Sequence, residues 1–461
     1  MNQLNNLFLI LMEYDVIIIG GGPAGLFAAY ELCVNSPNLK VALIEKGSSI
    51  KERKRSDVMC GIGGAGTFSD GKLHFTPVLS HEKMLDLYTE DEYQKFLDYV
   101  DQLLTDFGVN TDYYPKNIEQ VKELVDDAKK NSIKLYIRKA RHVGSDVLPE
   151  IILNIEEFLR KKDVEIIDNT DVSDLLIKDG KLSGIITKEK KEYHSRSVIV
   201  APGRYNARWM QEIADKYDLG YKYEKVEVGV RVEFPEAVMK KHADLMYETI
   251  FLMHTPTFDD AVRTFCPCPN GLVAKEKYDG FVCVNGHSNS DHLSENSNFA
   301  FVSEISLTEP VENTIAYAKS IAQLATTIGG GKPILQRLSD LRMGRRSTWS
   351  RINKSFVTPS LKDVTPGDIA MALPFRTVKN LLEGFEMLDS VLPGINSGST
   401  LLYAPEIKLR SSKMKTDKNL ETHIKGLYVA GDGAGVSGNI VGAAATGIIA
   451  AQGIISKNKN R

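Results

Sequence analysis

The chain has 461 residues, of which 43% are hydrophobic and 25% charged, as expected for a globular protein of two or three domains. Lys and Arg number 57 against 60 Asp and Glu, so no overall basic excess favours nucleic acid or an anionic membrane as a partner. Five scattered cysteines, an odd number, favour reduced thiols and a cytoplasmic location.

The first residues form an apolar run, Leu7–Met12, without the basic start or the small-residue cleavage site of a signal peptide. The run leads directly into a predicted strand, and both Met1 and Met12 are candidate starts. We therefore expect a protein that has no signal peptide.

The chain's main motif is Asp15-Val-Ile-Ile-Ile-Gly20-Gly-Gly22-Pro23-Ala24-Gly25, a predicted buried strand followed by a G-x-G-x-x-G turn. Gly20 permits the turn, Gly22 lets a pyrophosphate approach, and Gly25 lets the next helix pack closely. Pro23 and Ala24 open that helix, whose N-terminus favours phosphate. The pattern predicts a dinucleotide site.

A second predicted strand, residues 40–44, ends at Glu45, twenty positions after Gly25. An acid at this position accepts hydrogen bonds from ribose hydroxyls, so we assign Glu45 and the adjoining Lys46 to the cofactor site. Residues 51–55 are interpreted as a solvated helix face.

A glycine-rich segment, residues 60–66, predicts a loop whose backbone can lie against a flat ligand through Gly61, Gly64 and Gly66. The alternative is a plain flexible linker.

Residues 77–131 are predicted to form a helical insertion, in which Thr89 and Glu92 form a capping box. Strand and helix patterns return from about 132, with a helix at 147–160 and a turn at Asp179-Gly180.

Residues 216–395 are predicted to form an antiparallel substrate domain with helices near 309–327 and 377–390. Its strand at 226–234 alternates strictly, which is typical of a half-buried strand.

The end of the chain returns to the first domain through a strand at 426–430, Gly431-Asp432 and an apolar stretch at 438–455. That stretch is interpreted as a buried helix and not a membrane span. The predicted fold class is α/β: a Rossmann-like dinucleotide-binding domain (1–76, 132–215, 396–461) with the helical insertion and an inserted α+β antiparallel-sheet domain.

With these motifs in place, the chain resembles FAD-binding flavoproteins of the glutathione-reductase superfamily. The resemblance implies that Asp432 contacts the ribityl and pyrophosphate region, that the backbone of Val172 meets adenine, and that Ala201 and Gly203 belong to a central motif. In that motif, Pro202 replaces the more usual Thr.

A narrower resemblance is to a bacterial family of uncharacterised FAD-dependent dehydrogenases. It rests on Cys60–Lys72, Arg263–Pro269, Val284-Asn-Gly286 and Arg410-Ser-Ser. The sequence departs from that family at 286–298, so we infer no substrate from this segment.

The candidate catalytic residues are Cys60, His74, Arg231, His287 and Arg410. Cys60 has no second cysteine nearby, which disfavours disulfide reduction. The arginines and His287 are candidates for anchoring an anionic or carbonyl substrate, although structural ion pairs are an alternative for each. Cys266-Pro-Cys268 is too closely spaced for zinc, and no metal is expected.

From these residues we expect an FAD-dependent oxidoreductase that acts on a small molecule by hydride transfer. A flavin oxidase or monooxygenase and a non-catalytic flavin-binding regulator are the alternatives. Because 216–395 lacks a second G-x-G-x-x-G unit, NAD(P)H would bind transiently. Finally, Gly438, Asn439 and Ile440 are predicted to offer N–H groups to the flavin's pyrimidine edge.

Overall fold

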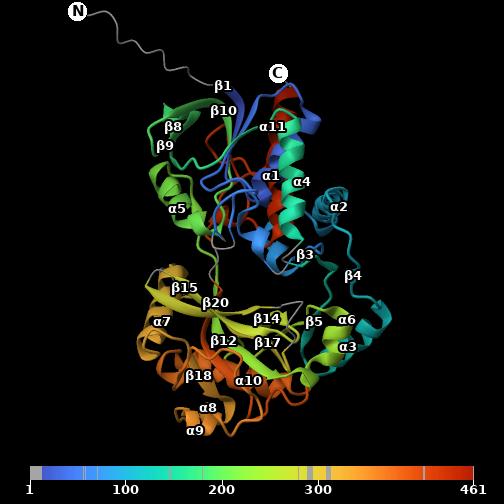
Figure 1. The fold of residues 1–461 in the computed structure, drawn as a ribbon, viewed down its shortest axis with the longest axis vertical. Helices are drawn as coiled ribbons and strands as arrows, with labels where there is room; N and C mark the ends of the chain where they lie inside the picture. Colours follow the sequence, from blue (N-terminus) through green and yellow to red (C-terminus); the bar gives the residue numbers. More distant parts are fainter. Residues whose placement is uncertain are drawn as a thin grey trace, which may run out of the picture. The chain divides into compact units, whose positions relative to one another are not determined.

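The computed structural model describes residues 13–54, 57, 59–69, 71–144, 147–178, 180–278, 280–287, 294–307, 313–408 and 411–459. It divides into two compact units (Figure 1). Unit 1 comprises the described residues of Met1–Thr111, Ala140–Lys222 and Ser411–Arg461. Unit 2 comprises those of Asp112–Lys139 and Tyr223–Arg410.

Unit 1 is organised around a sheet whose central strand is β1 (Glu13–Ile19). Its neighbours β2 (Val41–Ile44) and β10 (Glu192–Val200) both run parallel to it. The sheet continues with parallel β7 (Glu165–Ile167) and β22 (Leu427–Val429), and with the antiparallel hairpin β8 (Val172–Lys178) and β9 (Lys181–Thr187). The isoleucines of β1 are buried on both faces, as the apolar sequence predicted.

The helices of unit 1 pack beside this sheet, with α1 (Pro23–Asn35) against both α4 (Leu148–Lys161) and α11 (Ile440–Lys459) (Figure 1). Gly447 allows the close approach of α11, because a Cβ there would lie 2.0 Å from the Ala24 carbonyl oxygen. Among the described helices, α11 alone is long and apolar enough to cross a membrane, but 78% of its apolar window is buried. The prediction of a buried terminal helix is confirmed.

Shorter elements complete unit 1. The helix α2 (Glu90–Asp106) begins with the predicted capping box, in which Glu92 N donates to Thr89 Oγ1 and Thr89 N donates to Glu92 Oε2. The others are η1 (Gly64–Phe68), β3 (Lys72–His74), η2 (Leu79–Met84), β6 (Ala140–His142), η3 (Arg204–Asn206), α5 (Ala207–Lys216), β11 (Tyr221–Lys222), β21 (Lys413–Met414) and η6 (Asp432–Ala434).

Unit 2 contains a second sheet, in the order β19-β18-β20-β12-β17-β14-β13-β5. All its pairings are antiparallel except β18 with β19. The strands are β5 (Lys134–Tyr136), β12 (Val226–Pro235), β13 (Ile250–His254), β14 (Ala261–Cys268), β17 (Asn296–Ile305), β18 (Ile334–Arg337), β19 (Thr365–Pro366) and β20 (Leu401–Lys408).

One face of this sheet carries the apolar core of unit 2 beneath α7 (Thr314–Ile328) and α10 (Phe375–Leu388). The hairpin β15 (Leu272–Tyr278) and β16 (Phe281–His287) packs on the opposite face. Smaller elements are β4 (Tyr113–Tyr114), α3 (Ile118–Lys130), η4 (Glu236–Val238), α6 (Lys240–Met246), α8 (Leu338–Arg342), α9 (Trp349–Ile352) and η5 (Ile369–Met371).

The covering hairpin corrects one prediction. The strand at 226–234, expected to be half-buried, is central and buried on both faces, because β15 and β16 shield the face that carries Glu227, Arg231 and Glu233. Alternation in the sequence shows which residues share a face, but it does not show whether that polar face meets water.

Two further expectations differ from the structure. Residues 77–131 do not form one insertion, because α2 lies in unit 1 and α3 in unit 2. The predicted helix at 51–55 is a turn as far as it is described, and Arg53 within it is buried. Residues 1–12, Asp70, Asp179 and Arg410 lie outside the described part of the chain.

Candidate functional site

The turn after β1 adopts the geometry that its glycines predicted. Gly20 has φ +103°, and a Cβ there would lie 2.2 Å from the Ala201 carbonyl oxygen, just after β10. A Cβ on Gly25 would lie 1.9 Å from the Gly20 carbonyl oxygen, so only glycine allows α1 to start so close to the strand. A Cβ added to Gly22, by contrast, would have its nearest neighbour, the Cα of Gly64, 3.9 Å away. The described residues therefore leave room at Gly22.

Glu45 connects three glycine turns. Its carboxylate is buried and accepts hydrogen bonds from the backbone N–H groups of Gly21 at 2.7 Å and of Gly47 and Gly61 at 2.8 Å each. A carboxylate has about four acceptor positions, so three such bonds leave capacity for one further donor. The contact predicted between Glu45 and a ribose hydroxyl is compatible with this network and stays a prediction.

The glycine-rich loop packs against the first turn and is not a flexible linker. Gly63 N donates to the Gly21 carbonyl oxygen at 2.7 Å, and the Cα of Gly22 would lie 3.1 Å from a Cβ on Gly64. On the other side, a Cβ on Gly66 would lie 3.0 Å from Ile440 at the start of α11. These contacts bring the loop, the first turn and the last helix together.

Arg53 holds this loop in place, a role that the sequence did not reveal. Its Nη1 donates to the carbonyl oxygens of Ile62 at 2.8 Å and Gly64 at 3.0 Å, and to Thr67 Oγ1 at 3.0 Å. Burial lowers the pKa of the guanidinium below its ordinary value. The only sequence signal was the proximity of a basic run to the loop, because backbone carbonyls carry no residue-type signature.

Asp432 follows β22 in the turn that the sequence indicated. Arg204 Nε lies 3.0 Å from its Oδ2, and Ser437 Oγ donates to its Oδ1. A Cβ on Gly433 would lie 2.4 Å from the Gly203 carbonyl oxygen, so the turns after β10 and β22 are adjacent. The structure thus brings the central motif and the Asp432 motif together.

The segment before α11 is ordered by side chains. Asn439 precedes the helix, and its Oδ1 accepts a hydrogen bond from Gly442 N at 2.8 Å, as an N-cap residue does. Its Nδ2 lies 2.9 Å from Nε2 of the buried His81. The predicted contact of Gly438, Asn439 and Ile440 with flavin stays a prediction, but the segment lies beside the glycine loop.

On the other side of Glu45, Lys46 forms an ion pair of 3.2 Å with Asp171, and Thr170 N donates to the Glu45 carbonyl oxygen. Val172 begins β8 immediately afterwards and is buried. The predicted adenine and ribose contacts therefore come from neighbouring segments.

This arrangement fits a dinucleotide. The helix α1 begins with Gly22 as its N-cap and without a side-chain capping bond, so its first N–H groups have no acceptor within the helix. An uncapped helix end beside open space is suited to a pyrophosphate. The predicted cofactor residues, which are far apart in the sequence, line one region of unit 1.

The two catalytic candidates of unit 1 differ in exposure. Cys60 is half-buried, and burial raises the pKa of its thiol, followed by the effect of Glu45. Such a thiol is mostly protonated at neutral pH and is a weak nucleophile. His74 lies in β3 and is buried.

Arg231 is the most unusual buried side chain of unit 2. It is 0% exposed, and its hydrogen-bond acceptors are Asn298 Oδ1 at 2.7 Å, the Cys266 carbonyl oxygen at 2.8 Å and Cys268 Sγ at 3.2 Å. Among the described residues it forms no ion pair, and its Nη1 has no hydrogen-bond partner. Nδ2 of the buried Asn298 lacks an acceptor as well. Two linked side chains thus present donors that need an acceptor.

The backbone around Arg231 is shaped to fit it. Cys266 has φ +43°, uncommon for a residue other than glycine, at a register shift between β14 and β17 that directs its carbonyl to Arg231. A Cβ on Gly286 would lie 1.7 Å from Arg231 Nη2, so glycine is required there. His287 follows with an exposed side chain. The Cys266-Pro-Cys268 motif therefore packs around Arg231.

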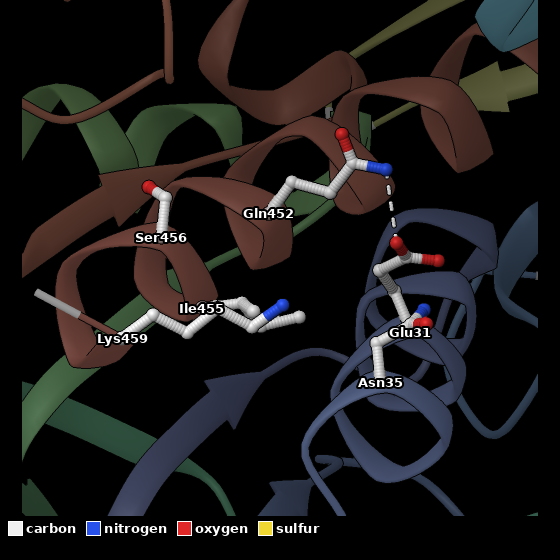
Figure 2. A pocket seen from close by; sticks show the side chains of 6 residues that line it. All are labelled: Glu31, Asn35, Gln452, Ile455, Ser456 and Lys459. Carbon is white, nitrogen blue, oxygen red and sulfur yellow. Dashed lines mark hydrogen bonds between the residues drawn. The ribbon is translucent and has the colours of Figure 1, made fainter.

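A cavity of about 280 Å³ lies elsewhere in unit 1, between the C-terminal ends of α1 and α11. Figure 2 shows Gln452 pointing at Glu31, to which its Nε2 donates a hydrogen bond at 2.9 Å. Glu31 also accepts a bond from Tyr99. Because its buried carboxylate already has partners and the cavity is far along α1 from Gly22, we assign it no function.

Comparisons with known proteins agree with this division. Residues 15–221 match a family described as an FAD binding domain, and residues 225–409 match one described as FAD-dependent protein, C-terminal domain-like. An uncharacterized protein of Clostridium beijerinckii is 27% identical, over 96% of this chain and 80% of its own.

Among solved structures, glycine oxidase from Bacillus cereus is 14% identical with a TM-score of 0.40, covering 96% of this chain and 95% of its own. Formate oxidase from Aspergillus oryzae is 13% identical with a TM-score of 0.46, covering 97% of this chain and 99% of its own. The functional assignment rests on the family matches.

Proposed function

The two family matches identify an FAD-dependent oxidoreductase, and we propose that it acts on a small anionic molecule by hydride transfer with non-covalently bound FAD. Bound FAD supplies the capacity to accept and donate hydride. The protein binds the flavin, orients the substrate and tunes the electronic properties of the flavin. The single observation that carries the substrate class is the buried Arg231, whose Nη1 lacks a partner.

In unit 1, the proposed roles follow from position. The uncapped start of α1 at Gly22, Pro23 and Ala24 binds the pyrophosphate, with Asp432 beside it. Glu45 takes a ribose hydroxyl, and the backbone of Val172 borders adenine. The N–H groups at Gly438–Ile440 face the pyrimidine edge of the flavin, where a positive helix end stabilises added negative charge.

In unit 2, Arg231 and Asn298 bind the anionic group of the substrate. A buried guanidinium without a counter-charge costs several kcal/mol, and an incoming carboxylate or phosphate oxygen would offset that cost. Charge-assisted bonds of this kind are strong and directional, so they orient the substrate as well as bind it.

Several finer assignments belong to the same proposal. We also propose that unit 1 belongs to the glutathione-reductase superfamily, and its paired motifs around Gly22 and Asp432 support this. The enzyme is proposed to be cytoplasmic, because an odd number of scattered cysteines favours reduced thiols. The anion itself reduces the flavin, and NADH or NADPH is an alternative electron donor that would bind only transiently, because 216–395 has no second dinucleotide motif.

The purified protein should be yellow, and acid precipitation should release FAD. Anaerobic titration with NADH, NADPH and a set of small carboxylates and phosphate esters should then bleach the flavin absorbance with at least one nicotinamide or anion. A colourless protein that ignores added FAD would refute the cofactor assignment. Bleaching by neutral substrates alone would refute the anionic substrate class.

A further inference from the structure

The most exposed large apolar side chains of the described residues lie in one segment of unit 2, residues 343–375. Among the described residues, the four most exposed large apolar side chains are Phe356 at 96%, Phe375 at 77%, and Met343 and Met371 at 66% each. Trp349, in the same segment, is 45% exposed. Side chains this exposed contribute nothing to the packed core, so their clustering needs another explanation.

The first part of this segment is strongly basic. Residues 341–362 contain six Lys or Arg and no Asp or Glu, although the whole chain has a net charge of −3. Within the described residues, Arg345 is the only one of the six that forms an ion pair, and its partner is the buried Asp340. The six basic residues are Arg342, Arg345, Arg346, Arg351, Lys354 and Lys362.

Hydrogen bonds hold two parts of this surface side by side. Ser347 N donates to the Gly367 carbonyl oxygen at 2.8 Å. The buried Gln336 joins them again, because its Nε2 donates to the Arg345 carbonyl oxygen and its Oε1 accepts from Ile369 N, each at 2.8 Å. The segment around α8 and α9 (orange in Figure 1) is therefore fixed next to η5, and the exposed side chains stand on a defined backbone.

We propose that this surface, which we call the docking face (Met343, Arg345, Arg346, Trp349, Lys354, Phe356, Met371 and Phe375), binds an anionic lipid bilayer. Exposed Phe, Trp and Met alternating with Lys and Arg is the composition of segments that lie in a membrane interface. The apolar side chains enter the headgroup and acyl boundary, and the cations attract anionic lipid.

Other occupants fit less well. A symmetric dimer through this face would place two basic surfaces against each other, which is unfavourable. A nucleic acid would meet the cations, but it would leave Met343 and Met371 without an apolar partner. The bilayer satisfies both the charge and the apolar side chains.

The test is vesicle flotation of the FAD-loaded full chain. Phosphatidylcholine vesicles that contain about one third phosphatidylglycerol should bind it, and phosphatidylcholine alone should not. Raising the salt to about 1 M should release it, because the screening length falls to about 3 Å. Phe356→Ser should weaken binding about tenfold, and the double change Arg346→Glu with Lys354→Glu at least as much.

A matched control lies on α7 in the same unit, where Leu324 is 47% exposed and Lys319 is exposed. Leu324→Ser with Lys319→Glu should leave binding unchanged, and all variants should keep the FAD content of the wild type. Absent or salt-insensitive vesicle binding, or equal losses in the control, would overturn the proposal. The proposal would also be overturned if the protein bound no vesicles but shifted a duplex oligonucleotide. The same holds if it bound no vesicles and formed a dimer that Phe356→Ser abolished.

Discussion

In unit 1 the donors gathered around Gly22 and Glu45 are backbone N–H groups, whereas in unit 2 the donors around Asn298 are side-chain groups buried in a sheet. The first arrangement depends on glycines that let backbone segments meet. The second depends on strand register, which places Arg231 and Asn298 on one face. The difference implies that the two regions should respond differently to mutation.

The largest effect is expected where a glycine brings two backbone segments together. Gly25→Ala would place a Cβ 1.9 Å from the Gly20 carbonyl oxygen, so the strand and α1 must separate. We expect a loss of about 4 kcal/mol or more in unfolding free energy, measured by urea denaturation, together with loss of FAD.

Gly22→Ala is the matched control, since its Cβ would have no neighbour within 3.9 Å. This variant should keep its unfolding free energy to within about 1 kcal/mol and still bind FAD poorly, because the methyl group occupies the space proposed for pyrophosphate. Equal behaviour of the two variants would show that the room at Gly22 has no role in binding.

Two buried arginines of unit 2 provide the next comparison. Arg263 pairs with the buried Glu227, with its Nη2 2.7 Å from Glu227 Oε2, whereas Arg231 pairs with no carboxylate among the described residues. Arg263→Met should cost about 3–5 kcal/mol of unfolding free energy, because it breaks a buried ion pair by removing one partner.

Arg231→Met should be neutral or stabilising in the same urea experiment, because it removes a buried charge that lacks a counter-charge. A residue kept at a cost to stability is expected at a binding site. If Arg231→Met destabilises the protein as much as Arg263→Met, Arg231 is a structural group.

We also expect acid to destabilise unit 2, because this unit contains a buried histidine. His242 packs edge-on against Phe251, and burial, followed by the charge of Lys241, lowers its pKa to about 4. Between pH 6.5 and 4 the unfolded histidine binds a proton that the folded one does not. The contribution of the neutral, buried His242 to the unfolding free energy is complete above pH 6.5, and it should decrease by about 2–3 kcal/mol as the pH falls to 4.

The two tryptophans allow this loss to be assigned to a unit, because Trp209 lies in unit 1 and Trp349 in unit 2. In the Trp209→Phe variant the remaining tryptophan is Trp349 of unit 2, so its fluorescence-monitored unfolding should show the acid dependence. Adding His242→Phe to this variant should remove the acid dependence. Replacing the exposed His254 by Gln should leave it in place. A pH dependence that survives His242→Phe would contradict the assignment.

A smaller effect is expected at Arg53. Arg53→Met removes the hydrogen bonds to the carbonyls of Ile62 and Gly64, so the glycine loop should loosen and FAD affinity should fall by about 1–3 kcal/mol. Isothermal titration of the apoprotein with FAD measures this. Lys51→Met, at an exposed pair with Glu157, should change the affinity by less than about 0.5 kcal/mol.

The sequence predicted unit 1 better than unit 2, for a physical reason. A strand, a glycine turn and a following acid have fixed spacing, so Gly20, Gly22, Gly25 and Glu45 could be placed from residue types alone. Arg231 was named as a candidate, but its partner Asn298 and the glycine that admits it, Gly286, come from distant strands. Arg53 was misread because its acceptors are backbone carbonyls.

The most direct test of the two proposed sites is an anaerobic flavin-bleaching titration of the wild type, Gly22→Ala and Arg231→Met with the anion that reduces the wild type. Arg231→Met should keep a full complement of FAD and need about 100-fold more anion for half-reduction, the scale of a lost buried charge contact. Gly22→Ala should instead lose FAD. An Arg231→Met protein that is reduced at the wild-type anion concentration would contradict the role proposed for Arg231.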